Sequence, residues 1–184
     1  MKFVFKIAAA AAALACLSAQ AFPIAAPGTE GFSVIVGTTG HVEARYEGNS
    51  ASFSNDLLLP GFAGVIFNNH GSAVGSTVDL GSFVAGTELI FQLHVNNTGN
   101  NFFTGPASRN PDQHTHARVQ DNWEPGRTLV SFEDLFNGPF EYNDLSFSFT
   151  NTRSVQVVPE PETYALMLAG LGVVGALARR HKAT

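Results

Sequence analysis

Residues 87–97 read TELIFQLHVNN, a stretch in which apolar and polar side chains alternate. Its apolar members fall on one face of an extended chain: Leu89, Phe91, Leu93 and Val95. Its polar members fall on the opposite face: Gln92, His94 and Asn96. A period of two is typical of a β-strand that buries one face, so the stretch predicts a strand.

The same alternation recurs along the chain between clusters of turn residues. Residues 144–151 set apolar against hydroxyl side chains: Leu145, Phe147 and Phe149 oppose Ser146, Ser148 and Thr150. Shorter runs of this kind lie at 32–36, 42–46, 65–67, 77–80, 117–119 and 128–132. Glycine, asparagine and proline separate them at 61–64, 68–75, 96–106 and 137–139. We therefore predict an all-β domain, a β-sandwich or jelly-roll-like fold with phenylalanines between two sheets.

The N-terminal residues 1–21 have the three parts of a secretory signal peptide. Lys2 and Lys6 precede an uncharged, alanine-rich run at 7–17, and a small-x-small cleavage site ends at Ala21. We expect cleavage after Ala21, which removes the only cysteine, Cys16. The mature chain would then have neither a disulfide nor a thiol nucleophile. The alternative is a lipoprotein signal in which Cys16 is acylated.

The C-terminal residues 158–184 form a second targeting segment. A proline-rich stretch at 158–161 leads into an uncharged run at 164–178, and a basic end follows at 179–182. A helix of this length rises about 22 Å, less than the roughly 30 Å of a hydrocarbon core. The run therefore predicts a short transmembrane helix. Its basic end places the C-terminus in the cytoplasm and the body of the protein outside.

This tail resembles the PEP-CTERM sorting signal of Gram-negative bacteria. The resemblance rests on an apolar helix flanked by Val158, Pro159, Glu160, Pro161, Arg179 and Arg180. It implies that an exosortase, a membrane-embedded transpeptidase, cleaves near the Pro-Glu-Pro motif. The chain would be anchored transiently in the inner membrane and then reach the cell surface or the medium. Because exosortase systems accompany exopolysaccharide production, the resemblance also implies exopolysaccharide as a partner.

Residues 22–157 remain for the β domain, a length that suits one domain with its own core. All acidic residues of the chain except Glu160 and Glu162 lie in this region, against five arginines and no lysine. Such a negative balance argues against nucleic acid as a partner.

A dense group of oxygen-bearing side chains flanks the predicted turn at 137–139. Its members are Glu133, Asp134, Glu141, Asn143 and Asp144. In a hairpin they would meet at the mouth of one loop, and calcium takes roughly 6–8 oxygen ligands. The sequence thus predicts either a calcium site or a turn in which Asp134 and Asp144 accept main-chain N–H groups.

The same segment resembles the end of an uncharacterised β-rich domain of exported bacterial proteins. The resemblance rests on Phe-Glu-Asp-Leu at 132–135 and Tyr-Asn-Asp at 142–144. In that family the loop is richer in aspartate, whereas Phe140 and Glu141 stand here where an acidic pair is expected. This departure weakens the calcium interpretation.

His114 and His116 lie two residues apart, so an extended chain would place both rings on one side, with Asp112 close by. Two imidazoles and a carboxylate can hold zinc if a further ligand is supplied. The surrounding residues are equally typical of a solvated loop.

Trp123 is the only tryptophan and has polar neighbours on both sides. An aromatic ring beside carboxylates and amides can stack on a sugar, and Tyr142 or Tyr46 would extend such a platform. The alternative is that Trp123 closes one end of the sandwich.

The sequence holds no serine elbow, no zinc-protease motif and no phosphate-binding glycine loop. We therefore expect a non-catalytic surface or matrix protein that is associated with exopolysaccharide and needs no cofactor. A calcium-dependent carbohydrate-binding module is the first alternative. A secreted glycan-active enzyme is the second, with Glu133 and Glu141 as its candidate acid pair.

Overall fold

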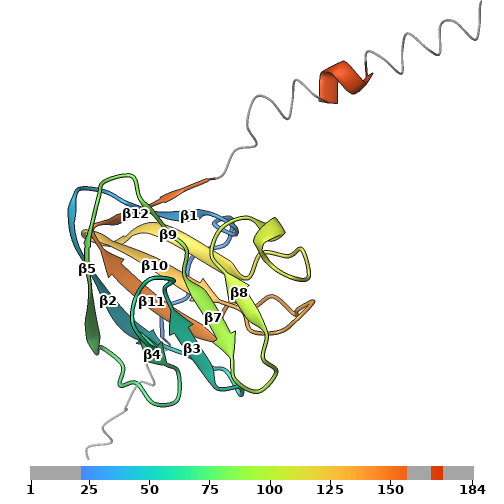
Figure 1. Cartoon of the computed structure of the whole chain (residues 1–184). Helices are drawn as coiled ribbons and strands as arrows, with labels where there is room; N and C mark the ends of the chain where they lie inside the picture. Colours follow the sequence, from blue (N-terminus) through green and yellow to red (C-terminus); the bar gives the residue numbers. More distant parts are fainter. Residues whose placement is uncertain (1–21, 157–166, 172–184) are drawn as a thin grey trace, which may run out of the picture.

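The computed structural model describes residues 22–156 and 167–171 (Figure 1). The predicted signal peptide lies outside the described residues, as do Val158, Pro159, Glu160, Pro161, Arg179 and Arg180. Of the predicted tail helix, residues 167–171 are described and are helical. Within the described ranges, no helix combines the length and the apolar character needed to span a membrane.

Residues 22–156 form twelve strands and one short 3₁₀ helix. The elements are β1 (Ser33–Val36), β2 (Gly40–Gly48), β3 (Asn55–Leu58), β4 (Phe67–Asn68), β5 (Thr77–Phe83), β6 (Glu88–Leu89), β7 (Gln92–Val95), β8 (Asn101–Phe103), η1 (Ala107–Arg109), β9 (Ala117–Glu124), β10 (Arg127–Phe132), β11 (Leu145–Thr150) and β12 (Thr152–Val155). The prediction of an all-β domain is therefore confirmed.

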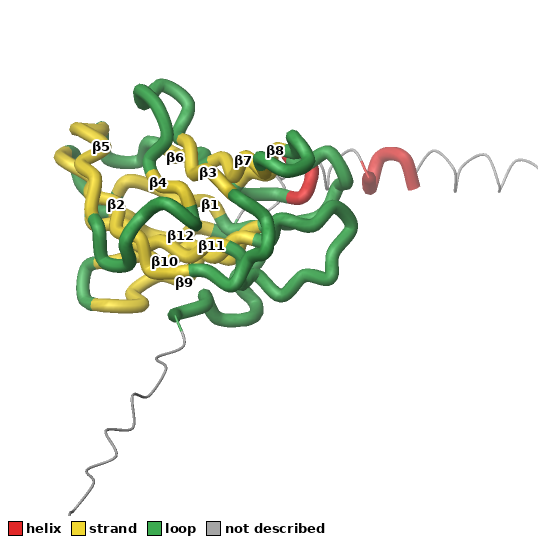
Figure 2. The backbone as a smooth tube through the Cα atoms, turned by 90° about the horizontal axis from the view of Figure 1, so that it is seen from below, coloured by secondary structure: helices red, strands yellow, loops and turns green. Residues whose placement is uncertain are grey.

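The strands are arranged in two facing layers (Figures 1 and 2). One layer is a five-stranded antiparallel sheet with the order β5-β2-β11-β10-β9. The other holds a three-stranded sheet, β12-β1-β6, and a four-stranded sheet, β4-β3-β7-β8. These two sheets follow each other along the chain, because β6 leads into β7 through Ile90 and Phe91.

The hydrophobic core lies between the layers and is built largely from aromatic rings. Phe147 of β11 stacks on Phe67 of β4, with ring centroids 5.9 Å apart. Phe149 of the same strand stacks on Phe91 at 4.1 Å. Both contacts join the five-stranded sheet to the opposite layer, and all four rings are buried. The alternation read from residues 144–151 thus marks the inner face of β11.

Asn151 makes the corner at which the chain passes from one layer to the other. It lies between β11 and β12 and has a φ of 55°, a left-handed conformation that asparagine tolerates better than most residues. Its side-chain oxygen accepts the Thr38 N–H at 3.0 Å, and its amide donates to the Thr38 carbonyl at 2.7 Å. The corner is therefore fixed to the turn between β1 and β2.

An N-terminal strap (residues 22–27) lies against the outer face of the five-stranded sheet. The Ala25 N–H donates to Ser131 Oγ at 2.8 Å, and that hydroxyl bonds the Ser146 hydroxyl at 2.9 Å. Both serines are fully buried, as is Ser148 on the same face. The polar residues of β11 therefore face away from the core, as predicted, but they are covered rather than solvated.

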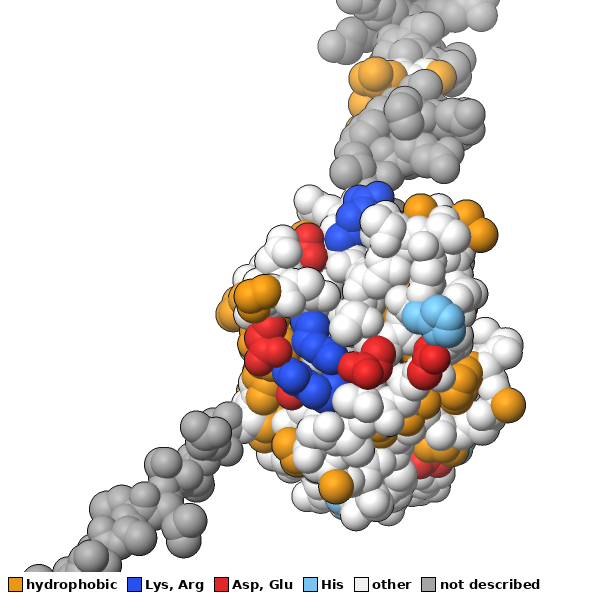
Figure 3. Space-filling model, turned by 90° about the vertical axis from the view of Figure 1, so that its left-hand side faces the viewer, with side chains coloured by type: hydrophobic (Ala, Val, Ile, Leu, Met, Phe, Trp, Pro, Cys, Tyr) orange, Lys and Arg blue, Asp and Glu red, His pale blue; other side chains and the backbone are white. Residues whose placement is uncertain are grey.

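Ion pairs continue the cover along this outer face. They join Arg45 with Glu47, Arg45 with Glu124, and Arg127 with Glu43, at N–O distances of 2.6–2.8 Å. Ser148 donates to the Glu47 carboxylate beneath them. Figure 3 shows arginine and acidic side chains gathered in one patch on one side of the domain. Because these glutamates are paired with arginines, this patch carries little net charge.

Three strands were not predicted: β3, β8 and β12. β8 lies inside residues 96–106, which were predicted to be a turn cluster, and that part of the prediction is wrong. The strand predicted at 87–97 is also divided into β6 and β7. Short strands that begin with Asn or Thr carry too few apolar positions to display an alternation.

Candidate functional site

The connection between β10 and β11 brings three carboxylates together. Glu133 and Asp134 directly follow β10, and Asp144 directly precedes β11. Because Phe132 pairs with Leu145 across the hairpin, the three residues meet at its mouth. One oxygen from each lies within 4.8 Å of the others. We call Glu133, Asp134 and Asp144 the carboxylate cluster; it contains three of the five residues predicted as calcium ligands.

Glu133 is fixed by main-chain donors from its own loop. Its Oε1 accepts the Leu135 N–H at 3.1 Å. Its Oε2 accepts the Glu141 N–H at 2.8 Å and the Tyr142 N–H at 3.2 Å. Only 2% of Glu133 is exposed, and these donors offset part of the cost of burying its charge. The loop is thereby folded back onto the carboxylate cluster.

The two aspartates are linked to each other and to the opposite layer. The Asp134 N–H donates to Asp144 Oδ2 at 2.8 Å. Asn55, at the start of β3, donates its amide to Asp134 Oδ2 at 2.7 Å. Asn55 is fully buried and was not predicted as a site residue. It is 79 residues from Asp134 and lies on a strand that the alternation did not reveal, so no local pattern could have indicated it.

The cluster changes the protonation of its aspartates. Burial raises the pKa of Asp144 to about 8, and the neighbouring carboxylates of Asp134 and Glu133 contribute to the rise. Burial also raises the pKa of Asp134, although the hydrogen bond from Asn55 opposes that change. Three like charges at this separation repel strongly, so a bound proton or a cation is needed to stabilise them.

A polar hollow of about 290 Å³ opens beside the carboxylate cluster. Its walls are formed by Ser50, Ser52, Phe53, Asp134, Leu135, Glu141, Asn143 and Asp144. Glu141 and Asn143 are the two remaining predicted calcium ligands, and Asn143 Nδ2 donates to Glu141 Oε2 at 3.1 Å in an exposed position. All five predicted residues therefore belong to one region, but only three form the buried cluster.

The histidine pair is separated by the fold. His116 is fully buried, with Nδ1 2.9 Å from the Glu133 carbonyl oxygen and Nε2 2.8 Å from Asp112 Oδ2. Its ring also stacks on Phe102 at 3.6 Å. His114 is exposed. Since acceptors occupy both ring nitrogens of His116, neither offers a lone pair to a metal in this arrangement.

Asp112 acts as the partner of His116 inside the domain. Burial alone would raise its pKa, but hydrogen bonds from the Asn137 N–H, the His116 ring and the His114 N–H lower the pKa instead. The pair thus ties the segment before β9 to the loop after β10, next to the carboxylate cluster.

The aromatic residues predicted for sugar binding lie apart. Trp123, near the end of β9, packs on the Arg45 guanidinium, with 5.7 Å between the Arg45 Cζ and the ring centroid. Tyr142 faces Arg118, at the start of β9, at 4.3 Å, and is only 4% exposed. Tyr46 is also buried, and its hydroxyl donates to the Asn69 carbonyl. Only Trp123 keeps a partly exposed ring.

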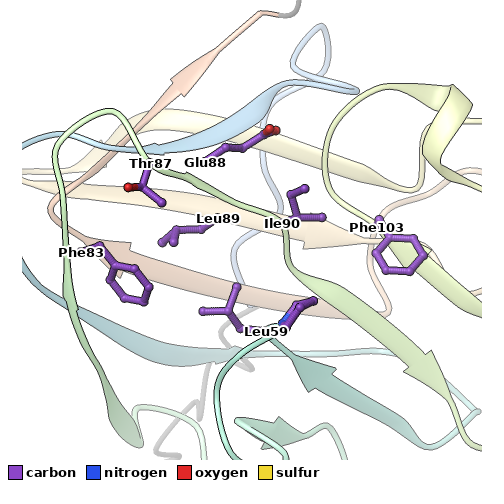
Figure 4. A pocket seen from close by; sticks show the side chains of 8 residues that line it. Leu59, Phe83, Thr87, Glu88, Leu89, Ile90 and Phe103 are labelled. Carbon is purple, nitrogen blue, oxygen red and sulfur yellow. The ribbon is translucent and has the colours of Figure 1, made fainter.

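A second hollow, of about 440 Å³, lies where β6 passes into β7 (Figure 4). Its walls are mainly apolar and consist of Leu59, Pro60, Phe83, Thr87, Glu88, Leu89, Ile90 and Phe103. Glu88 is paired with Arg109 at 2.8 Å, and this hydrogen bond lowers the pKa of Glu88. The hollow offers apolar surface but no free reactive group.

Comparison with known proteins identifies the segment that follows the β domain. Residues 157–182 match the family model described as the PEP-CTERM protein-sorting motif. No curated protein and no solved structure matches the chain. A β domain that leads into a sorting motif defines an exported protein.

More specifically, the chain carries a PEP-CTERM motif and is sorted by an exosortase, a membrane protease or transpeptidase. The motif implies transient membrane anchoring followed by localisation at the surface. The predicted PEP-CTERM sorting signal is therefore confirmed, whereas the transmembrane helix, its orientation and the exopolysaccharide partner stay predictions. The likeness of residues 132–144 to an uncharacterised β-rich domain stays a prediction.

Proposed function

We propose that the protein is a non-catalytic component of the cell surface or extracellular matrix that associates with exopolysaccharide. The observation that carries the proposal is the sorting motif, which begins at residue 157, directly after a β domain that ends at Val155. Exosortase-linked export accompanies exopolysaccharide production, which supports an association of the domain with polysaccharide. A short transmembrane tail helix with its basic end in the cytoplasm belongs to the same proposal.

The environment of Glu133 supports a non-catalytic role. A glycosidase needs one carboxylic acid that can protonate the leaving oxygen. Both oxygens of Glu133 already accept main-chain N–H groups, so neither is placed to donate a proton to a glycosidic bond. A structural or cation-binding role fits this arrangement better than hydrolysis.

The exported protein is expected to lack the basic end at 179–182 and to be recovered with the exopolysaccharide. Cleavage near Pro159, Glu160 and Pro161 removes the tail, and the domain then stays with the polysaccharide. Mass spectrometry of the envelope, medium and polysaccharide fractions would report both termini and the distribution. A triple alanine variant of the Pro-Glu-Pro residues should retain its tail and accumulate in the envelope.

Gln156→Ala is the matched control, because it lies beside the motif without altering it, and it should be processed normally. Recovery of the exported protein with Arg179 and Arg180 still attached would refute processing. An unchanged distribution in cells that make no exopolysaccharide would refute the association while leaving the sorting intact.

The polar hollow favours a second function, calcium-dependent carbohydrate binding. It offers hydroxyl, amide and carboxylate groups next to the ring of Phe53, the mixture of polar and apolar surface that sugars require. A cation at the adjoining carboxylate cluster would order these groups.

On a glycan array with calcium present, binding is expected to fall at least tenfold in Asn143→Ala, because Asn143 lines the hollow. A tenfold loss corresponds to about 1.4 kcal/mol, the size of one polar contact. Trp123→Ala should bind normally. If Trp123→Ala loses binding and Asn143→Ala does not, the sugar site lies at Trp123. If the unaltered protein binds no glycan, this second function is refuted.

A further inference from the structure

Asn55 carries a buried oxygen that has no donor. The residue is fully buried, and its amide nitrogen is used by Asp134. Its Oδ1 accepts no hydrogen bond from any residue in the described ranges. Buried polar atoms are nearly always satisfied, so an oxygen of this kind indicates a missing partner, either a hydrogen-bond donor or a cation. It belongs to the same planar amide that contacts the carboxylate cluster.

Each aspartate of the carboxylate cluster also has an oxygen, Oδ1, that accepts no N–H group from the part of the chain that the structure describes. Each uses Oδ2 to accept one N–H group, from Asn55 in the case of Asp134 and from Asp134 in the case of Asp144. Both aspartates line the polar hollow, which gives access to the cluster from solvent. Together with Glu133, the region offers carboxyl oxygens from three residues and one neutral amide oxygen.

We propose that Glu133, Asp134, Asp144 and Asn55 Oδ1 bind a calcium ion that ties the two layers of the domain together. All these donors are oxygens, which favours a hard cation over zinc or copper. Calcium suits an irregular donor set, and the hollow leaves room for water or a sugar hydroxyl in its remaining positions. The inference rests on the calcium requirement of the second function, but it needs no glycan.

The position of the donors gives the ion a structural role. Asn55 begins β3 in the four-stranded sheet, whereas the carboxylates flank β10 and β11 in the five-stranded sheet. An ion held by both sets connects the layers at the end where the β10–β11 loop opens. It would also fix the wall of the polar hollow formed by Asp134 and Asp144.

Thermal unfolding of the full-length chain tests the site, first in EDTA and then with calcium chloride. Extracellular calcium modules bind with dissociation constants of about 0.1–1 mM. At tenfold excess over such a constant, Tm should rise by about 3–6 °C. Magnesium at the same concentration should give a clearly smaller rise, because it demands a regular octahedral shell.

Two variants identify the ligands. Asp144→Asn removes a charged ligand but can keep the hydrogen bond from the Asp134 N–H, so it should fold and lose the calcium response. Asp56→Asn is the matched control: Asp56 follows Asn55 on β3 but its carboxylate accepts from Asn68, and the response should remain. Hydrogen exchange should show that calcium protects residues 55–58 as well as residues 133–144.

Three results would overturn the inference. These are an unchanged Tm in calcium, an undiminished response in Asp144→Asn, and an equal response to magnesium. If calcium protects only residues 133–144 from hydrogen exchange, Asn55 is not a ligand and the ion does not connect the layers. Since the measurement contains no sugar, its failure leaves exopolysaccharide association untouched, and loss of glycan binding alone leaves the calcium site standing.

Discussion

Replacing Phe147 by alanine is expected to lower the free energy of unfolding by about 3–5 kcal/mol. Phe147 is fully buried at the centre of β11. Its ring stacks on Phe67 and lies 5.9 Å from the ring of Tyr46, so the substitution leaves a cavity between the two layers. The lost transfer energy and the cavity both contribute, because the surrounding structure relaxes only partly into the space.

Urea unfolding of the two proteins in EDTA measures this loss. Phe136→Ala is the matched control, since Phe136 is 46% exposed and its replacement should change stability by no more than about 0.5 kcal/mol. A loss below about 1.5 kcal/mol for Phe147→Ala would show that the layers are not packed through this ring. The urea dependence of both proteins should match that of the parent.

In the absence of calcium, the free energy of unfolding is expected to fall as pH rises from about 4 to about 8. Asp144 has an ordinary value of 3.8 when unfolded, and burial raises its pKa to about 8 in the fold. Between these values the folded protein binds the additional proton, so its stability is greatest at the acidic end and is lost as the pH passes through the folded value. The slope for one such group is at most about 1.4 kcal/mol per pH unit.

The difference between the parent and Asp144→Asn isolates this effect. The asparagine resembles the protonated acid and has no charge to bury, so the variant should overtake the parent as pH rises toward 8. Groups whose pKa is lowered by folding, such as Asp112, make stability fall at acidic pH. They affect the parent and the variant equally, so their contribution cancels when the two free energies of unfolding are subtracted. A difference that does not vary with pH would show that Asp144 is ionised in the folded protein.

The fold could be predicted from sequence where strands bury one face against the core. β2, β5, β10 and β11 all lie at or around the runs that the alternation marked. The covering of the outer face could not be predicted in the same way. Ser131 and Ser146 are polar and belong to the outward-facing set, yet the strap buries them through a bond from Ala25, 106 residues before Ser131. Contacts over such separations leave no local pattern.

For the site, the hairpin register was sufficient to group Glu133, Asp134 and Asp144. The positions of Glu141, which is exposed, and Asn143, which is half-buried, depend on the backbone of the intervening loop, where Asn137 and Tyr142 have positive φ values. Asn137 could be expected to adopt that conformation, because asparagine tolerates it and a glycine follows, but Tyr142 could not. The contribution of Asn55 required the three-dimensional pairing of β3 with β7, which places it opposite the hairpin.

The pairing of β1 with β12 has a consequence for the timing of folding. Ser33 pairs with Val155, and the sorting motif begins at residue 157. A chain that crosses the membrane from its N-terminus presents β1 long before β12, and sheets that join distant segments form slowly. The three-stranded sheet can close only when almost the whole chain has been translocated. For a chain exported in this order, the strand that completes the sheet is the one that directly precedes the sorting motif.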